Sequence, residues 1–584
     1  MNISIKKACV LACSSLLLFN TQVPSSQAQT AHGSEAIIDL AGQFHPVVGR
    51  KGMVSSQEAR ASQIGVDILR QGGNAVDAAV AVGFALAVTL PKAGNIGGGG
   101  FMLVHNANTQ DTHAIDYRET APAAAHRNIF LDKDGSVNKQ KARNSFQSAG
   151  VPGTVAGLLL ALKKYGSMKP IQVMAPAIKL AREGFVLSEE LALELQQRHS
   201  QLSRSKAGQH IFYKPDGSFY KAGEKLVQRD LANTLEKIAL SNGESFYQGE
   251  TAELIVKDSQ RHAGLMTRED LKHYKPVLRN AATGKYRGYE LVTMPPPSAS
   301  GIHIIQMLNI LENSQLQNVP HNSAAHLHQL SSAMQFAFAD RSEHLGDPDF
   351  YDVPVDIITS KSYAKKLAET INPNQAKTAA EVKPLDVQVF KESPDTTHFS
   401  VIDKDGNAVS NTYTLNFSYG SGIVVKGAGF ILNNEMDDFS AKPGEPNAFG
   451  LLGNEANAIE AGKRPLSSMA PTIIFKNNKP FMITGSPGGS KIANAVLQTI
   501  SNVIDYDMNI AQASSVPRIH HQWLPDVLNY ESGISADTVK ILNQMGYTTK
   551  TSKGIGSTQS ILVKGGIVYG ASDPRRPGAA TIAE

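Results

Sequence analysis

The chain has 584 residues and a mass of 62.6 kDa, which is enough for one large core or for several domains. With 41% hydrophobic and 18% charged residues, the composition is that of an ordinary globular protein and argues against a disordered chain or a coiled coil. A formal net charge of +4 gives no electrostatic reason to expect nucleic acid or an anionic membrane as a partner.

Residues 1–28 have the pattern of a secretory signal. Lys6 and Lys7 form its basic start, and an apolar run at 8–19 is too short to span a bilayer. A small-x-small cleavage site ends at Ala28. Removing this segment takes away two lysines and no acid, so the mature chain keeps a net charge of +2.

Both cysteines of the chain, Cys9 and Cys13, lie in the signal segment. The mature chain is therefore predicted to have no disulfide, no cysteine nucleophile and no thiolate metal site. Residues 10–13 resemble a lipoprotein box, but the apolar run continues beyond Cys13, so we expect no lipid anchor. Export without cysteine suits a bacterial periplasm or the medium.

The first part of the mature chain predicts two helices and then a strand pair. Ser55 or Ser56 can cap a helix at 57–71, and a nearly all-apolar helix at 75–90 is expected to be buried. Four glycines at 97–100 allow close backbone approach before a strand. The predicted strands are 101–105 and 114–119. The second strand ends in Arg118-Glu119, for which an ordinary surface ion pair is the alternative to a functional role.

The middle of the chain is predicted to be mainly helical, and nothing in its pattern separates a catalytic role from scaffolding. One strand, 289–294, interrupts it before a run of three prolines. The predicted helices are 155–165, 170–183, 188–199, 229–241, 250–260, 268–274, 302–311 and 324–344.

Thr396 stands where a loop meets the first strand of a predicted hairpin. The strands are 397–402 and 408–414, with a turn at 403–407. If the backbone were cut before Thr396, this residue would carry a free α-amine beside its own hydroxyl. Such an amine has a pKa near 8, so part of it is unprotonated near neutral pH and can accept the hydroxyl proton. Without further support, an ordinary exposed strand start is the simpler interpretation.

Beyond this hairpin the pattern predicts more strands and then returning helices. Together with the helical middle, this order fits a layered arrangement of helix, sheet, sheet and helix. The predicted strands are 422–425, 428–432, 472–475, 481–484, 559–563 and 567–570, and the predicted helices are 491–504, 510–515 and 536–545.

Three polar clusters lie at turns in this second part, at 433–438, 464–468 and 485–490. The last joins a strand to a helix and can cradle an anion or oxyanion, although it fails as a P-loop and as a serine elbow. Singly, each cluster has a structural explanation, such as a solvated face for Lys463-Arg464. Together they favour a substrate with an ammonium and a carboxylate at one end and an acyl group at the other.

Seven motifs in order make the chain similar to the bacterial γ-glutamyltranspeptidases, also called glutathione hydrolases. They are DYRE (116–119), TTHFS (396–400), TYTLN (412–416), LNNEMDDF (432–439), RPLSSM (464–469), GSPGG (485–489) and GASDPR (570–575). The resemblance covers essentially all of the mature chain. One departure is Phe417-Ser418-Tyr419, where close bacterial relatives are expected to have a small, threonine-rich sequence.

The resemblance implies an N-terminal-nucleophile hydrolase with an αββα sandwich. The family precursor cuts itself, here between Asp395 and Thr396. That cut would leave a large subunit at 29–395 and a small catalytic subunit at 396–584, which together form a heterodimer.

The resemblance also implies roles for individual residues. Thr396 would be the nucleophile, with Thr414 orienting it, and Gly488 and Gly489 would supply the oxyanion amides. The α-carboxylate of the substrate would be bound by Arg118, Ser467 and Ser468, and its α-ammonium by Asn416, Glu435 and Asp438. Residues 443–453 would form a lid that carries Phe449. No cofactor, metal, nucleic acid or stable membrane anchor is expected.

The expected chemistry is cleavage of the γ-glutamyl amide of glutathione through an acyl-threonine, with transfer to water or to an amino acid or peptide. Two alternatives stay open. One is a cephalosporin or glutaryl acylase of the same architecture, although a glutaryl chain has no ammonium for Glu435 and Asp438 to bind. The other is a periplasmic binding protein that never matures.

Overall fold

The computed structural model describes residues 44–382, 396–445, 447, 451 and 453–584, and Phe44–Glu584 forms one compact unit. The predicted signal segment, Asp395 and Phe449 lie outside the described residues. Within the described part, no helix has both the length and the apolar composition needed to cross a bilayer.

Two seven-stranded sheets form the centre of the unit, and every neighbouring pair of strands in them is antiparallel. The first sheet has the order β19 (Ala580–Ala583), β2 (Met53–Ser56), β10 (Thr397–Ile402), β11 (Ala408–Thr414), β3 (Gly99–Asn106), β4 (Asp111–Tyr117) and β7 (Val277–Arg279). The second has the order β1 (Val47–Gly49), β18 (Ile567–Ser572), β17 (Gln559–Lys564), β13 (Lys479–Thr484), β12 (Thr472–Lys476), β9 (Tyr289–Thr293) and β8 (Ala282–Tyr286).

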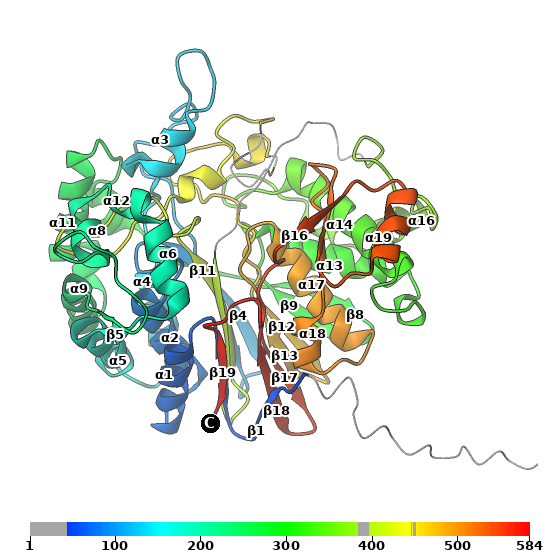
Figure 1. Cartoon of the computed structure of the whole chain (residues 1–584), viewed down its shortest axis with the longest axis horizontal. Coiled ribbons are helices and arrows are strands. Elements are labelled where there is room, and N and C mark those ends of the chain that lie inside the picture. Colours follow the sequence, from blue (N-terminus) through cyan, green and yellow to red (C-terminus); the bar gives the residue numbers. More distant parts are fainter. Residues whose placement is uncertain (1–43, 383–395, 446, 448–450, 452) are drawn as a thin grey trace, which may run out of the picture. The chain divides into compact units, whose positions relative to one another are not determined.

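Helices cover the outer face of each sheet, so the predicted αββα layering is confirmed (Figure 1). Beside the first sheet lie α1 (Ala59–Arg70), α2 (Ala75–Thr89), α4 (Thr154–Tyr165), α5 (Pro170–Glu183), α9 (Arg229–Leu240) and α11 (Glu250–Arg261). Beside the second lie α13 (Ala299–Leu311), α14 (Ala324–His344), α16 (Lys361–Glu369), α17 (Lys491–Ile504), α18 (Ile510–Ser515) and α19 (Ala536–Gln544). Each helical layer and its sheet share a large apolar core.

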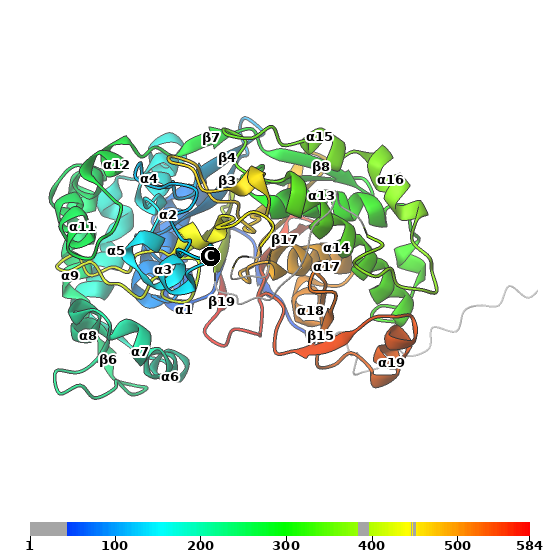
Figure 2. The same ribbon diagram turned by 90° about the horizontal axis from the view of Figure 1, so that it is seen from above.

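Shorter elements complete the unit. Seen from above, α6, α7 and α8 lie together at the side of the helical layer that covers the first sheet (Figure 2). The short helices are α3 (Lys139–Asn144), α6 (Glu189–Gln197), α7 (His199–Leu202), α8 (Lys206–Phe212), α10 (Glu244–Tyr247), α12 (Arg268–His273) and α15 (Val355–Ile358). The small sheets are β5 (Phe185–Val186) with β6 (Lys225–Leu226), and β14 (Ile519–His520) with β15 (Leu528–Glu531) and β16 (Thr549–Ser552).

Helix α2 shows how the sequence sets the local structure. Asn74 caps its start by accepting the N–H groups of Val76 and Asp77, while the Asp77 carboxylate accepts the N–H of Asn74. All fifteen residues of the helix are buried, as its nearly all-apolar composition predicted. The helix therefore forms the middle of the core behind β10 and β11 rather than an amphipathic surface helix.

The hairpin of β10 and β11 lies at the centre of the first sheet, between β2 and β3. Asp403 closes its turn by accepting the N–H groups of Asp405 and Asn407, and Gly406 supplies a positive φ of 88°. Both strands are buried along their whole length. The predicted hairpin is confirmed, but its first strand is interior rather than exposed.

Antiparallel pairing brings the functional loops to one end of the two sheets, which is uppermost in Figure 1. In the first sheet Thr414 pairs with Gly99, and Gly100 pairs with Tyr117, so β11 and β4 both end where β10 begins. In the second sheet Thr472 at the start of β12 pairs with Thr484 at the end of β13. The loops before β12 and after β13 therefore leave the second sheet together.

The strands predicted at 422–425 and 428–432 are wrong. This segment makes tight turns, and Val424 and Ile431 form only an isolated bridge. Gly427 and Gly429 have φ values of 78° and 76°, which interrupt an extended strand. The apolar residues that suggested strands are buried against the helices instead.

Candidate active site

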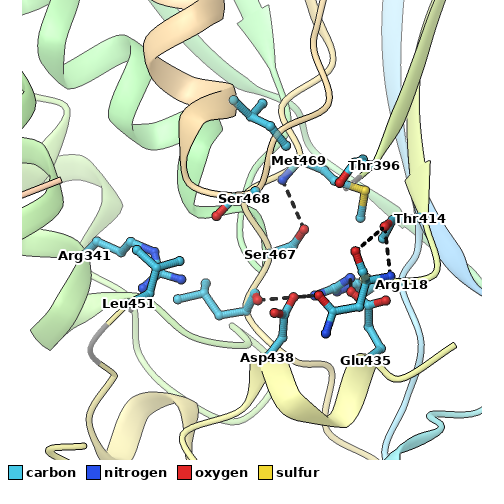
Figure 3. Close-up of a pocket in the computed structure, with 14 residues that line it drawn as sticks. Arg118, Arg341, Thr396, Thr414, Glu435, Asp438, Leu451, Ser467, Ser468 and Met469 are labelled. Atoms are coloured by element: carbon cyan, nitrogen blue, oxygen red, sulfur yellow. Dashed lines mark hydrogen bonds and ion pairs between the residues drawn. The ribbon is translucent and has the colours of Figure 1, made fainter. Parts of the chain in front are cut away.

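One pocket brings together side chains that are far apart in the sequence (Figure 3). Nine of the ten predicted site residues line it, and Gly488, the tenth, immediately precedes the lining residue Gly489. The lining consists of Arg118, Arg341, Thr396, Thr414, Asn416, Glu435, Asp438, Leu451, Leu466, Ser467, Ser468, Met469, Gly489 and Ile492.

Thr396 lies directly before β10, and Thr414 ends the neighbouring strand β11. Thr396 is only 7% exposed. The Thr414 hydroxyl accepts the Asn416 N–H at 2.9 Å, and Asn416 has a φ of 77°, a conformation that asparagine tolerates. The Asn416 side chain donates to the Asn434 carbonyl at 3.0 Å. These bonds fix the turn after β11, so two hydroxyls and an amide face the same pocket.

Arg118 follows β4 and is fully buried, so the alternative of a surface ion pair is wrong. Its guanidinium pairs with the carboxylates of Glu435 and Asp438, which lie in a 3-10 turn of the polar cluster 433–438. It also donates to the Pro465 carbonyl at 3.1 Å. Burial lowers the pKa of Arg118, but the surrounding carboxylates outweigh that effect and raise it above its usual value.

Three carboxyl groups surround this single guanidinium. Burial raises the pKa of Glu435, Asp438 and Glu119, and Arg118 offsets part of that rise. For Glu119, whose carboxylate lies 3.7 Å from Arg118, the pKa is raised to about 7. The carboxyl groups that contact Arg118 directly therefore outnumber the one guanidinium between them, in a site shielded from water. A second cation at this point would be stabilised strongly, and an alkylammonium fits that requirement.

The loop before β12 presents two serines beside the arginine. The Ser467 hydroxyl accepts the Met469 N–H at 3.1 Å, which leaves its own proton available to a ligand. Lys463 and Arg464 are 3% and 5% exposed, so the alternative of a solvated face is wrong. Arg464 donates to the Arg118 carbonyl and to the Lys275 carbonyl at 2.9 Å, and so holds the Arg118 backbone in place.

The glycine-rich loop after β13 leads into α17. Gly488 and Gly489 have φ values of 133° and 56°, which favour glycine. Their carbonyls accept the N–H groups of Lys491 and Ile492, whereas their own N–H groups donate no hydrogen bond within the described part of the chain. Two amide donors at the start of a helix can therefore stabilise an oxyanion next to Thr396.

Comparison with known proteins identifies the family. The model of the γ-glutamyltranspeptidase family matches residues 61–583. The chain belongs to the γ-glutamyltranspeptidase family. It is 52% identical over 534 residues to the glutathione hydrolase proenzyme of Escherichia coli strain K12, an alignment that covers 91% of this chain and 92% of that one.

Solved structures agree with the fold. A cephalosporin acylase from Bacillus halodurans matches with a TM-score of 0.81 and 27% identity over 92% of this chain and 97% of that chain. A Helicobacter pylori γ-glutamyltranspeptidase chain matches with a TM-score of 0.55 and 45% identity over 56% of this chain and 93% of that chain. The family match and the higher identity favour γ-glutamyltranspeptidase over the acylase alternative.

Sequence reasoning missed several residues of this γ-glutamyltranspeptidase pocket. Arg341 comes from α14 and lines the side remote from Thr396, together with Leu451, which belongs to the segment 443–453 predicted as a lid (Figure 3). Arg341 lowers the pKa of Asp438 and so acts on the same charge array as Arg118. No motif marked Arg341, because α14 is buried along most of its length.

No group of three or more potential metal ligands occurs among the described residues.

Proposed function

We propose that this protein cleaves the γ-glutamyl amide bond of glutathione and related compounds and transfers the γ-glutamyl group to water, an amino acid or a peptide. The observation that supports this most directly is the single pocket that joins Thr396 to the array of Arg118, Glu435 and Asp438. The pocket thus combines a candidate nucleophile with a site for a charged amino-acid head group.

Maturation supplies the base. Self-cleavage between Asp395 and Thr396 gives Thr396 a free α-amine, which accepts the proton of its own hydroxyl. The products are a large subunit at 29–395 and a small subunit at 396–584. Each seven-stranded sheet contains strands from both segments, so the two subunits stay together as a heterodimer. The solved Helicobacter pylori chain, which covers 56% of this one, is consistent with such a division.

The head group is recognised by alternating charges. The substrate α-ammonium lies between Glu435, Asp438 and the side-chain oxygen of Asn416. The α-carboxylate accepts from Arg118 and from the hydroxyls of Ser467 and Ser468. Arg118 pairs with both acids, and these contacts fix the relative positions of the groups that bind the head group.

Catalysis follows an acyl-enzyme cycle. The Thr396 oxygen attacks the γ-carbonyl carbon, and Thr414 orients it. The N–H groups of Gly488 and Gly489 stabilise the negative charge that develops on the carbonyl oxygen. The C–N bond breaks as the α-amine passes its proton to the leaving amine. Water or an acceptor amine then attacks the γ-glutamyl ester, which frees Thr396. All of these groups belong to the chain, so the cycle needs no cofactor.

The signal-like segment indicates the compartment in which the protein acts. We propose that residues 1–28 direct export, so that the mature enzyme acts in the periplasm. The basic start and short apolar run of this segment support the proposal.

A pair of anilides tests the substrate assignment. γ-Glutamyl-p-nitroanilide and glutaryl-p-nitroanilide differ only in the α-ammonium. Losing one charge-assisted contact in a buried site costs roughly 2–3 kcal/mol, so kcat/KM for the glutaryl compound should be about 30- to 150-fold lower. Equal rates for the two compounds would support the acylase alternative instead.

A further inference from the structure

A second hollow, of about 380 Å3, lies beside the catalytic pocket. The wall between them is one short segment, in which Asn416 lines the catalytic pocket and Phe417 lines the hollow. Asn434 also lines the hollow. It joins both wall residues, because its carbonyl accepts from the Asn416 side chain at 3.0 Å and its side-chain oxygen accepts the Phe417 N–H at 3.3 Å. The two cavities are therefore neighbours.

Phe417 links the hollow to the catalytic end in another way. It also packs against the apolar cluster that contains Met469 and Ile492, two residues of the catalytic pocket. The head-group site at Arg118 is fully buried. A group attached beyond the γ-amide must therefore extend away from Arg118 toward the surface, and Phe417 forms part of the adjoining surface.

The hollow is strongly cationic. Arg143, Arg198 and Arg204 line it, and none of the ten described residues around it is acidic. Arg143 pairs with Asp437 at 3.1 Å. Among the ion pairs of the described residues, none involves Arg198 or Arg204. Three guanidiniums and one nearby carboxylate leave a local charge of about +2, which matches a ligand with two carboxylates.

The hollow is also rigidly built. Arg204 donates to the carbonyls of Gln201 and Ser421, each at 3.1 Å, so its position is fixed without neutralising its charge. The Gln201 side chain in turn donates to the carbonyls of Ser418 and Gly420, each at 3.1 Å. Burial lowers the pKa of Arg204, which means that its charge is held there at a cost in free energy. An anion in the hollow would offset that cost.

We propose that this hollow is a subsite for carboxylates on the group attached to the γ-glutamyl unit, both in the leaving group of a donor and in an acceptor. Groups with two carboxylates bind best, those with one bind less well, and uncharged groups gain nothing from it. The inference rests on the proposed γ-glutamyl transfer and assigns the hollow to the partner of the γ-glutamyl group.

Three donors that share the γ-glutamyl unit test the subsite. Their leaving groups carry two carboxylates in γ-glutamylglutamate, one in γ-glutamylalanine and none in γ-glutamyl-p-nitroanilide. In Arg198→Gln, KM should rise roughly 5- to 10-fold for the first donor, about 2- to 3-fold for the second and not at all for the third. Arg204→Gln should show the same order. The matched control is Arg182→Gln on α5, an exposed arginine paired with Glu236, which should leave all three KM values unchanged.

The outcomes separate the subsite from the proposed function. If the wild-type protein fails to cleave γ-glutamyl-p-nitroanilide, the proposed function is wrong. If it cleaves the anilide but Arg198→Gln changes all three KM values equally, or changes none, the subsite is wrong. Within the described residues the Arg198 side chain makes no hydrogen bond or ion pair, whereas Arg204 donates to neighbouring carbonyls. Arg198→Gln therefore tests the subsite even if Arg204→Gln disturbs the fold.

Discussion

Arg118 and Glu435 form a buried ion pair across 317 residues of sequence, and the predicted cut before Thr396 would place them in different subunits. Both side chains are shielded from water, at 0% and 1% exposure. A buried pair of this kind contributes little net stability, but breaking it leaves an uncompensated charge. We therefore interpret the pair as a preorganised receptor for the zwitterionic end of the substrate.

Arg118→Lys should weaken substrate binding much more than turnover. Lysine keeps the charge but cannot pair with Glu435 and Asp438 while also donating to a carboxylate in the same plane. Losing about 2–3 kcal/mol of binding free energy at the head group should raise the KM for γ-glutamyl-p-nitroanilide roughly 30- to 150-fold. Steady-state kinetics measures this. A lower kcat with unchanged KM would contradict a head-group role, and Arg182→Lys serves as the exposed control.

Gly485→Ala should disturb the oxyanion loop through one identifiable neighbour. A Cβ at Gly485 would lie 2.4 Å from Cε1 of His398, whose ring is fixed by Thr412 at 2.8 Å and Ser400 at 3.1 Å. Overpacking of this kind costs about 1–3 kcal/mol. Combining Gly485→Ala with His398→Ala removes the clash, so the double variant should be at least about 1 kcal/mol more stable than additivity predicts.

Urea unfolding of the four proteins measures that coupling. Gly578→Ala is the control, because a Cβ there meets nothing closer than 3.8 Å and should cost little. Strict additivity of the two substitutions would show that the His398 ring does not limit the loop at Gly485.

Buried histidines should make the protein sensitive to acid. Burial lowers the pKa of His326, His398 and His520 to about 3. The unfolded chain binds these protons as pH falls below about 6.5, whereas the folded chain does not. The contribution of these three groups is therefore fully present well above pH 6.5 and is lost as pH falls from about 6.5 toward 3, by up to roughly 4 kcal/mol per pH unit.

A single substitution separates the contribution of one histidine to this pH dependence. His326→Leu should reduce the slope of unfolding free energy against pH by about 1.4 kcal/mol per unit, whatever its effect on stability at pH 7. His210→Leu, at an exposed position, should leave the slope unchanged. An unchanged slope in His326→Leu would contradict the account of this histidine.

Local patterns in the sequence predicted most elements of the fold. The helices at 170–183 and 324–344 match α5 and α14 to the residue. Pro170 at the first position, Gly184 at the end and an amphipathic pattern mark α5, and the Ser323 cap marks the start of α14. The hairpin at Thr396 is also confirmed, because a polar turn separates two alternating segments. The segment 422–432 was predicted wrongly because its glycines and its burial against helices do not appear in a period-two pattern.

The candidate site was predictable only where residues cluster in sequence. Glu435, Ser467 and Gly489 stand in polar motifs, and the pocket contains all three. Arg341 stands alone in a long buried helix, so only the packing of α14 reveals it. The direct pairing of Arg118 with the acids expected to bind an ammonium is a long-range contact that no local pattern contains.

The most direct test is to determine the first residue of the smaller fragment in purified, active protein. The account predicts two unequal bands on a denaturing gel, with the smaller beginning at Thr396 and activity appearing in proportion to it. Thr396→Ser should still mature and retain some activity, while Thr396→Ala should stay uncut and inactive. A single uncut chain that releases the γ-glutamyl group at full rate would contradict the central claim.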